Sequence, residues 1–306
     1  MLVGHLEKLE GALRELRRTA HVEIHERVDL RAWTTLGVGG VAALVARCHS
    51  ENGVREVIDL AASHGLGWVV LGGGSRLVAP DRGFRVPVVS LTGELARWEP
   101  GVDGLVAGAG ANLAQVCRAA RRAGLSGVED LDGRQHSIGG FVNGAAHRVL
   151  GAGNALDWVE LQGPGASILR WTSSLSSPIP EPSVLHRRVV VRARFSLKNP
   201  GTAEAVPTTG LSGLSRPLRS IGPVFLDTHD ATAADLLDEV GFAGTALGGV
   251  RFGGSRGNRL LAGRSATASD VLELCRRARD SVASETGIEL SPALVFLDED
   301  GLAVPL

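Results

Sequence analysis

Residues 68–77 read WVVLGGGSRL, and this stretch sets the expectations for the rest of the chain. Four apolar residues, two of them β-branched, predict a short buried strand that runs into three glycines. Glycine has no Cβ, so the backbone can bend sharply there and approach a ligand closely. Successive N–H groups in such a turn form a concave site for a phosphate or pyrophosphate. An ordinary glycine-rich turn between strands is the alternative for this stretch taken alone.

Length and composition predict a globular protein of two or three domains. The chain has 306 residues, 44% of them hydrophobic and 21% charged, which is typical of a folded protein too long for one small core. The net charge of −1 and the lack of a basic block argue against a nucleic-acid partner. No apolar run is long enough to cross a bilayer, and residues 1–20 do not form a signal peptide. We therefore expect no membrane partner and a cytoplasmic location.

Cysteine and histidine give no support for a metal site. The cysteines Cys48, Cys117 and Cys275 are far apart and lack CxxC spacing, so we expect buried thiols in a reducing compartment. The nine histidines are dispersed, without HExxH or paired spacing. The sequence therefore predicts neither a disulfide nor a bound metal.

Helical and strand patterns alternate along the chain, which favours an α+β or α/β protein in two parts. Helices are predicted at residues 2–19, 54–64, 113–123, 231–240 and 268–284. Strands are predicted at residues 42–46, 68–71, 86–91, 105–107, 158–161, 189–197, 223–226, 258–262 and 293–297. The glycine-dense residues 132–147 predict a closely packed loop, and residues 198–220 a linker or mobile loop.

Three motifs occur in the order in which one enzyme family has them. Residues 34–40 (TTLGVGG) are similar to N-T-F-x-V-G-G, residues 71–77 (LGGGSRL) to L-G-G-G-S-N-L, and residues 132–140 (DGRQHSIGG) to A-G-I-P-G-S-I-G-G. Together they resemble the UDP-N-acetylenolpyruvoylglucosamine reductases, the MurB family of flavoenzymes. Weaker likenesses at residues 235–241 and 287–292 extend the resemblance to about residues 20–297.

The resemblance implies a fold and a cofactor. It implies an α+β protein that begins with a two-lobed FAD-binding domain of the vanillyl-alcohol-oxidase/MurB type at residues 1–200. The lobes would cover about residues 1–85 and 86–200, and a smaller α+β substrate domain would cover residues 201–306. FAD is the implied cofactor, and NADPH is the expected reductant if the family's half-reaction survives. The oligomeric state is left open.

The same resemblance assigns the FAD contacts to the three motifs and to one later strand. Arg76 stands where the family has asparagine, and Arg134 and His136 fall where the family has I-P-G. The implied cofactor-binding residues are Thr35, Val38, Gly39, Gly72, Gly73, Gly74, Ser75, Arg76, Leu77, Gly133, Arg134, His136, Ser137, Ile138, Gly140 and Val191.

The residues that carry the family's proton transfer differ in this chain. Residues 220–227 (SIGPVFLD) are similar to S-A-G-S-V-F-K-N, which places Pro223 at the position of the proton-donating serine. Residues 291–295 (SPALV) are similar to E-P-E-V-R, so Ala293 and Val295 replace a glutamate and an arginine. Neither proline nor alanine has a proton to donate, and a general acid contributes a factor of about 100 to 10,000 in rate.

Other side chains offer different chemistry. Residues 180–183 (PEPS) are similar to the family's Y-R-D-S, so an acid stands where an arginine is expected. The catalytic residues are therefore unknown, and the candidates are His136, His147, Glu181, Asp227 and His229. For each of them a solvated surface residue is the alternative.

Three functions follow from these observations. The leading hypothesis is a divergent FAD-binding oxidoreductase of specialised metabolism that acts on a small molecule other than the enolpyruvyl nucleotide. The second is a flavin-free, non-redox enzyme or a binding protein on the same scaffold. The third is the NADPH-dependent family reductase itself, with another donor such as Ser220 or Asp227.

Overall fold

A computed structural model describes residues 2–19, 21–101, 103–127, 136–144, 156–165, 167–174, 180, 182–197, 219–254 and 257–306. The chain forms two compact units, each discontinuous in sequence. Unit 1 comprises Met1–Glu26, Leu44–Gly73 and Pro87–Gly210, and unit 2 comprises Arg27–Ala43, Gly74–Val86 and Leu211–Leu306. The contiguous domains 1–200 and 201–306 stay a prediction, and the compact units differ from them because two N-terminal segments belong to unit 2.

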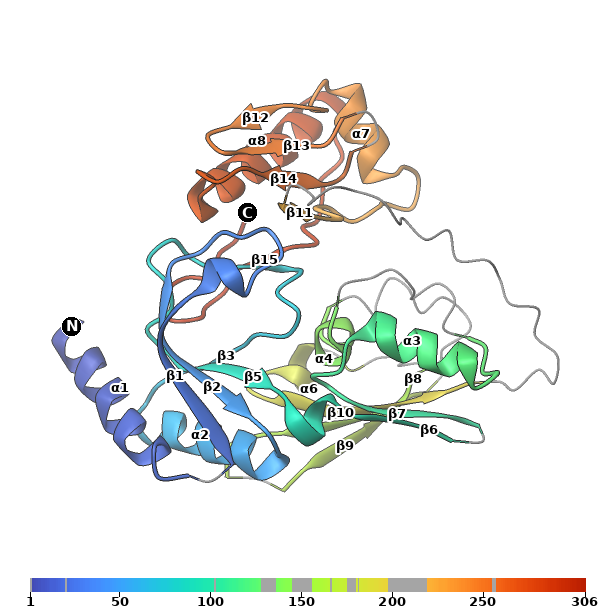
Figure 1. The fold of residues 1–306 in the computed structure, drawn as a ribbon. Coiled ribbons are helices and arrows are strands. Elements are labelled where there is room, and N and C mark those ends of the chain that lie inside the picture. The colour runs from blue at the N-terminus through green and yellow to red at the C-terminus, as the bar shows by residue number, and fades with distance from the viewer. Residues whose placement is uncertain are drawn as a thin grey trace. The chain divides into compact units, whose positions relative to one another are not determined.

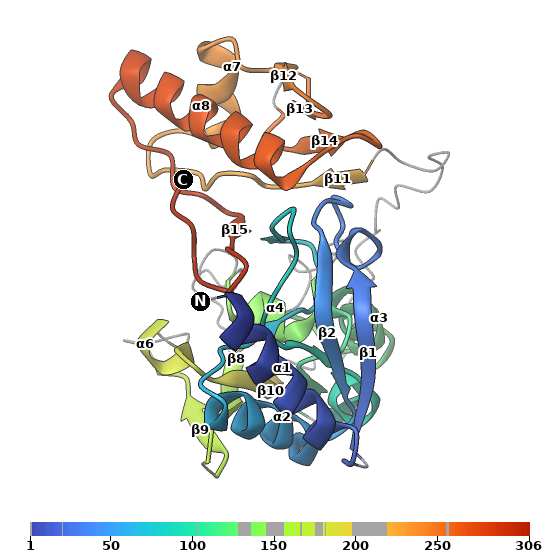
Figure 2. The ribbon, with the colours of Figure 1, turned by 90° about the vertical axis from the view of Figure 1, so that its left-hand side faces the viewer.

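The first sheet of unit 1 has the strand order β1-β2-β5-β3 (Val22–Asp29, Val41–Cys48, Val88–Leu91 and Val69–Val70). Strand β5 pairs in parallel with both β2 and β3. Helices α1 (Leu2–Leu16) and α2 (Glu51–Ser63) lie next to each other (Figure 2). The Ser50 hydroxyl caps α2, and the apolar residues of α2 recur at helical spacing, so one face of the helix is buried.

The second sheet of unit 1 is antiparallel, in the order β6-β7-β10-β8-β9 (Trp98–Gly101, Gly104–Gly108, Val189–Ser196, Leu156–Gln162 and Leu169–Thr172). Helices α3 (Leu113–Arg122) and α4 (Ile138–Val142) share a buried apolar core with it (Figure 1). Asn112 caps α3 by accepting the N–H of Gln115 at 3.1 Å. Shorter elements are η1 (Leu30–Ala32), η2 (Gly93–Ala96) and α6 (Pro182–Leu185).

Unit 2 contains a four-stranded antiparallel sheet in the order β11-β14-β13-β12 (Arg219–Ile221, Leu260–Ala262, Val250–Phe252 and Ala246–Leu247). Helices α7 (Ala233–Glu239) and α8 (Ala268–Thr286) share a core with this sheet. A capping box of Thr267 and Asp270 begins α8, and Gly287, at a left-handed φ of 72°, ends it.

Two segments from the first third of the chain complete unit 2. Leu36, Val38 and Val78 are buried in its core. Strand β4 (Leu77–Val78) pairs in parallel with β15 (Val295–Phe296). A sequence pattern does not show such pairing, because the two strands are more than 200 residues apart in the chain.

Most of the predicted elements are confirmed, but the predicted strand at residues 223–226 is wrong, and the loop predicted at residues 132–147 contains helix α4. Only Phe225 makes a β-bridge there, to Pro292. The side chain of Asn258 accepts the N–H groups of Val224 and Phe225 (3.0 and 2.9 Å) and donates to Phe225 O (2.7 Å). These side-chain bonds hold the segment next to its bridge, and the neighbouring strand β11 ends at Ile221, before the predicted strand begins. In the part of the chain that the structure describes, no helix is long and apolar enough to cross a membrane.

Candidate functional site

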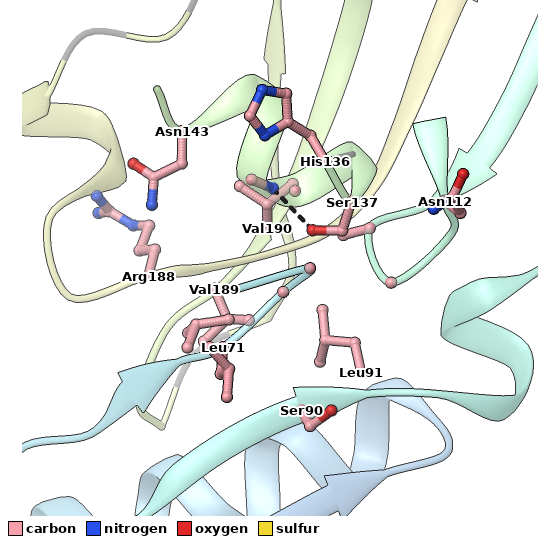
Figure 3. Close-up of a pocket in the computed structure, with 17 residues that line it drawn as sticks. Leu71, Ser90, Leu91, Asn112, His136, Ser137, Asn143, Arg188, Val189 and Val190 are labelled. Carbon is pink, nitrogen blue, oxygen red and sulfur yellow. Dashed lines mark hydrogen bonds between the residues drawn. The ribbon is translucent and has the colours of Figure 1, made fainter. Parts of the chain in front are cut away.

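Unit 1 contains a cavity of about 170 Å³ (Figure 3). Helix α4 and loops that follow strands of both sheets surround it. Small residues form one wall: Gly72, Gly73, Ala109, Gly110, Gly139 and Gly140. Apolar side chains form another: Val70, Leu71, Leu91, Val189 and Val190. The polar lining residues are Ser90, Asn112, His136, Ser137, Asn143 and Arg188. Pockets that enclose a whole cofactor usually exceed about 300 Å³, so this cavity suits part of a dinucleotide.

Gly72 is required by close packing against the third motif. A Cβ at this position would lie 2.1 Å from the Ser137 Oγ, far inside contact distance. The same Oγ accepts the N–H of Gly140 at 3.1 Å and caps α4. Two motifs that are 60 residues apart in the sequence therefore meet in one wall of the cavity.

Gly73 also belongs to unit 1 and lines the cavity, whereas the other predicted cofactor residues of the first two motifs lie in unit 2 and contact one another there. The Thr35 N–H donates to Gly74 O at 2.9 Å, and a Cβ at Gly74 (φ 61°) would lie 2.1 Å from Trp33 O. Gly39 has a φ of 114° and Val38 is fully buried. These contacts explain the glycines of the two motifs, and a role in FAD binding stays a prediction.

Arg76 is engaged within unit 2. Its Nε and Nη2 donate to Ala293 O at 2.9 and 2.7 Å, while its own carbonyl accepts the Val295 N–H at 2.9 Å. Leu77 pairs with Val295 in the short parallel ladder of β4 and β15. Ser75 belongs to the same turn.

Two further predicted cofactor residues are buried next to the lining of the cavity. Ile138 and Val191 are fully buried and do not line it. Ile138 N donates to Ala111 O and Val191 O accepts from Ala109 N, both at 2.9 Å. His136 lines the cavity and is only 8% exposed, whereas the predicted residues Gly133, Arg134, His147 and Glu181 lie outside the described residues.

The positions at which the resemblance predicts the family's serine and glutamate are neighbours in unit 2. The Ala293 N–H donates to Val224 O at 2.7 Å, so Ala293 lies next to the segment that carries Pro223. Pro223 is exposed and Ala293 is buried, and neither side chain can release a proton. Both Asp227 and His229 are exposed, and Asp227 accepts the N–H of Ala233, the first residue of α7, at 2.9 Å. These two candidates fit the solvated-surface alternative.

Comparisons with known proteins match two separate parts of the chain. One protein-family model, FAD binding domain, matches residues 42–160, and another, UDP-N-acetylenolpyruvoylglucosamine reductase, C-terminal domain, matches residues 214–297. The reductase of Heliobacterium modesticaldum is 32% identical over 281 residues, which cover 88% of each chain. The chain belongs to the MurB family. It is also 32% identical to the reductase of Thermus thermophilus, covering 87% of this chain and 99% of the relative.

The fold comparison agrees with this membership. The crystal structure of the MurB reductase from Thermus caldophilus matches with a TM-score of 0.67 at 27% identity, covering 90% of this chain and 98% of that one. The FAD-binding domain followed by the MurB C-terminal domain is thus confirmed. The protein is an FAD-binding oxidoreductase of the MurB family.

The described residues of the cavity fit the phosphate part of FAD. The glycine wall leaves no side chain between the backbone and a ligand, which is what close approach of a pyrophosphate requires. No carboxylate is among the described residues that line it. The described residues also contain no group of histidine, cysteine, aspartate and glutamate side chains suited to a metal ion.

Several lining residues are not among those predicted from the sequence. Asn112, Asn143 and Arg188 are polar and reach the cavity from three different elements or loops. Arg188 directly precedes β10, and a basic residue at the start of a strand is no signal for a cavity. Asn143 and Asn112 follow and precede short helices, where asparagine is common for reasons of capping alone.

Proposed function

We propose that the protein binds FAD in the unit 1 cavity and catalyses a redox reaction on a small molecule other than the enolpyruvyl nucleotide, as in specialised metabolism. The observation that carries this proposal is the pair of adjacent positions Pro223 and Ala293. In the family resemblance these positions hold the proton-donating serine and a glutamate, and here neither residue carries an ionisable proton. Without a general acid, a reaction that protonates carbon slows by a factor of about 100 to 10,000.

FAD supplies hydride-transfer chemistry when it is bound. The chain's own contribution is to bind and orient it. Gly72, Gly73 and Gly140 let a pyrophosphate reach the backbone, and Leu71 and Val190 offer an apolar surface for the rest of the molecule. NADPH remains the reductant that we propose, on the family resemblance alone.

The reductase itself is the second candidate, and the comparisons favour it. The relatives from Heliobacterium modesticaldum and Thermus thermophilus both bear the name of the reductase, and neither name points to a different substrate. This candidate needs another proton donor. Ser220 is the described hydroxyl closest in sequence to Pro223, and its Oγ accepts from Arg259 Nε and Nη2 at 3.3 and 3.1 Å. The match to the FAD-binding model argues against the flavin-free alternative.

One assay separates the two candidates. The purified protein is loaded with FAD and given NADPH and UDP-N-acetylenolpyruvoylglucosamine, with the Thermus thermophilus reductase as the reference under the same conditions. The proposal expects a bound flavin spectrum, reduction of the flavin, and turnover at least about 100-fold below the reference. Turnover within tenfold of the reference would establish the reductase instead, and Ser220→Ala would then test the donor.

A further inference from the structure

Arg188 lines the unit 1 cavity but is not among the residues that the resemblance implies for FAD binding. Among the described residues that line the cavity, Arg188 is the one arginine, and no aspartate, glutamate or lysine accompanies it. The amide of Asn143 lines the same cavity (Figure 3). A cation with no neighbouring carboxylate favours an anionic ligand.

Arg188 follows a residue with an unusual backbone conformation. Its neighbour Arg187 has a left-handed φ of 53°, which is unusual for a residue other than glycine. The Arg187 guanidinium lies over the ring of Trp68, 5.7 Å from the centroid. Arg188 Nη1 donates to Val184 O at 2.7 Å, which fixes the guanidinium with one of its five N–H donors. Two consecutive arginines thus have different surroundings: Arg187 stacks on an indole and Arg188 lines the cavity.

We propose that Arg188 binds a phosphate group of a nucleotide in this cavity. A guanidinium presents planar, paired N–H donors that match phosphate oxygens, and the glycine wall allows the same phosphate to approach the backbone. The inference rests on the proposed function in one respect, since the pyrophosphate of FAD is the first source of such a phosphate. A nucleotide substrate is the second source, and it offers the same chemistry.

Binding measurements with FAD and riboflavin test the proposal, because riboflavin has the same ring system without a phosphate. We expect Arg188→Gln to weaken FAD binding by about 10- to 100-fold, the range for losing a charged hydrogen bond, and riboflavin binding by less than about twofold. Arg187→Gln is the matched control, because it removes the same charge one residue away from the cavity lining. It should change neither affinity by more than about twofold.

Two further measurements keep the test decisive. Arg188→Lys retains the charge without the planar fork, so its loss of FAD affinity should lie between those of wild type and Arg188→Gln, and it serves if the glutamine variant does not fold. ADP added to the FAD-loaded protein reports on the second source. Arg188-dependent ADP binding with unchanged FAD affinity would assign the phosphate to a nucleotide substrate.

The inference and the proposed function can fail separately. Equal losses for FAD and riboflavin in Arg188→Gln, or less than twofold change for both FAD and ADP, would overturn the role of Arg188 and leave FAD binding intact. A wild-type protein that binds no flavin but binds ADP through Arg188 would overturn the proposed function and support the inference.

Discussion

The cavity of unit 1 and the segment around Pro223 in unit 2 differ in which residues packing requires. In the cavity, Gly72 has no alternative because the Ser137 hydroxyl occupies the place of a Cβ. Around Pro223 the backbone is held by Asn258, and the side chains at 223 and 293 form none of these bonds. Packing thus fixes the glycine that lets a ligand approach the backbone. Side chains that carry chemistry can change while the fold remains.

The largest expected effect comes from returning a donor to position 223. If this region has the family's geometry without its chemistry, Pro223→Ser should raise turnover of the enolpyruvyl nucleotide by about 100-fold, the lower range for one general acid. Oxidation of NADPH under saturating substrate measures it. Pro223→Ala is the control, since it changes the backbone in the same way without a hydroxyl. Equal rates for the serine and alanine variants would count against the comparison.

The next effect concerns the side chain that holds this segment. Asn258→Ala removes three hydrogen bonds to Val224 and Phe225 and should lower the free energy of unfolding by about 2 to 4 kcal/mol. Urea denaturation measures the change. Asn258→Asp keeps the acceptor and loses the donor to Phe225 O, so we expect a smaller loss. If the alanine variant is as stable as wild type, Asn258 does not hold the segment.

A smaller effect tests the packing of the cavity wall. Gly72→Ala places a Cβ against the Ser137 Oγ and should cost about 1 to 3 kcal/mol in stability or FAD binding. Thermal melting and FAD titration report the two contributions. Adding Ser137→Ala removes the clashing oxygen, so the double variant should recover part of the loss beyond additivity. Gly101→Ala, whose nearest atom would lie at 3.6 Å, serves as the control.

The smallest effect is a dependence of stability on alkaline pH. Burial raises the pKa of Cys275 to about 12, and that of Cys48 to about 12 as well. The unfolded thiol ionises near pH 8.5, so the contribution is complete below that pH and is lost as pH rises toward 12. At pH 9.5 each thiol should cost about 1 kcal/mol relative to pH 8. Urea midpoints at both pH values should show a shallower fall for Cys275→Ala.

Features with a local signal in the sequence were predictable. Helix α8 has its capping box at one end and Gly287 at the other, and α3 has a clear apolar face. The glycine motifs also located one wall of the cavity. In each case the residues that determine the structure lie within a few positions of one another, so the pattern contains the physical cause.

Features that depend on distant partners were not predictable. Asn258 acts on a segment 33 residues earlier, which turned a predicted strand into an irregular segment. Arg188 and Asn143 line one cavity from separate elements, and apolar periodicity says nothing of such convergence. The assignment of residues 27–43 and 74–86 to unit 2 depends on tertiary packing in the same way.

Asp81 has a consequence for how the chain folds during synthesis. Its carboxylate accepts the N–H groups of Ala268 and Ser269 at 2.7 and 3.0 Å, at the first turn of α8. The segment around Asp81 leaves the ribosome almost 190 residues before its partner. Unit 2 can therefore complete its packing only after nearly the whole chain has been synthesised. A fragment starting near residue 211 would lack part of its own core and should not fold alone.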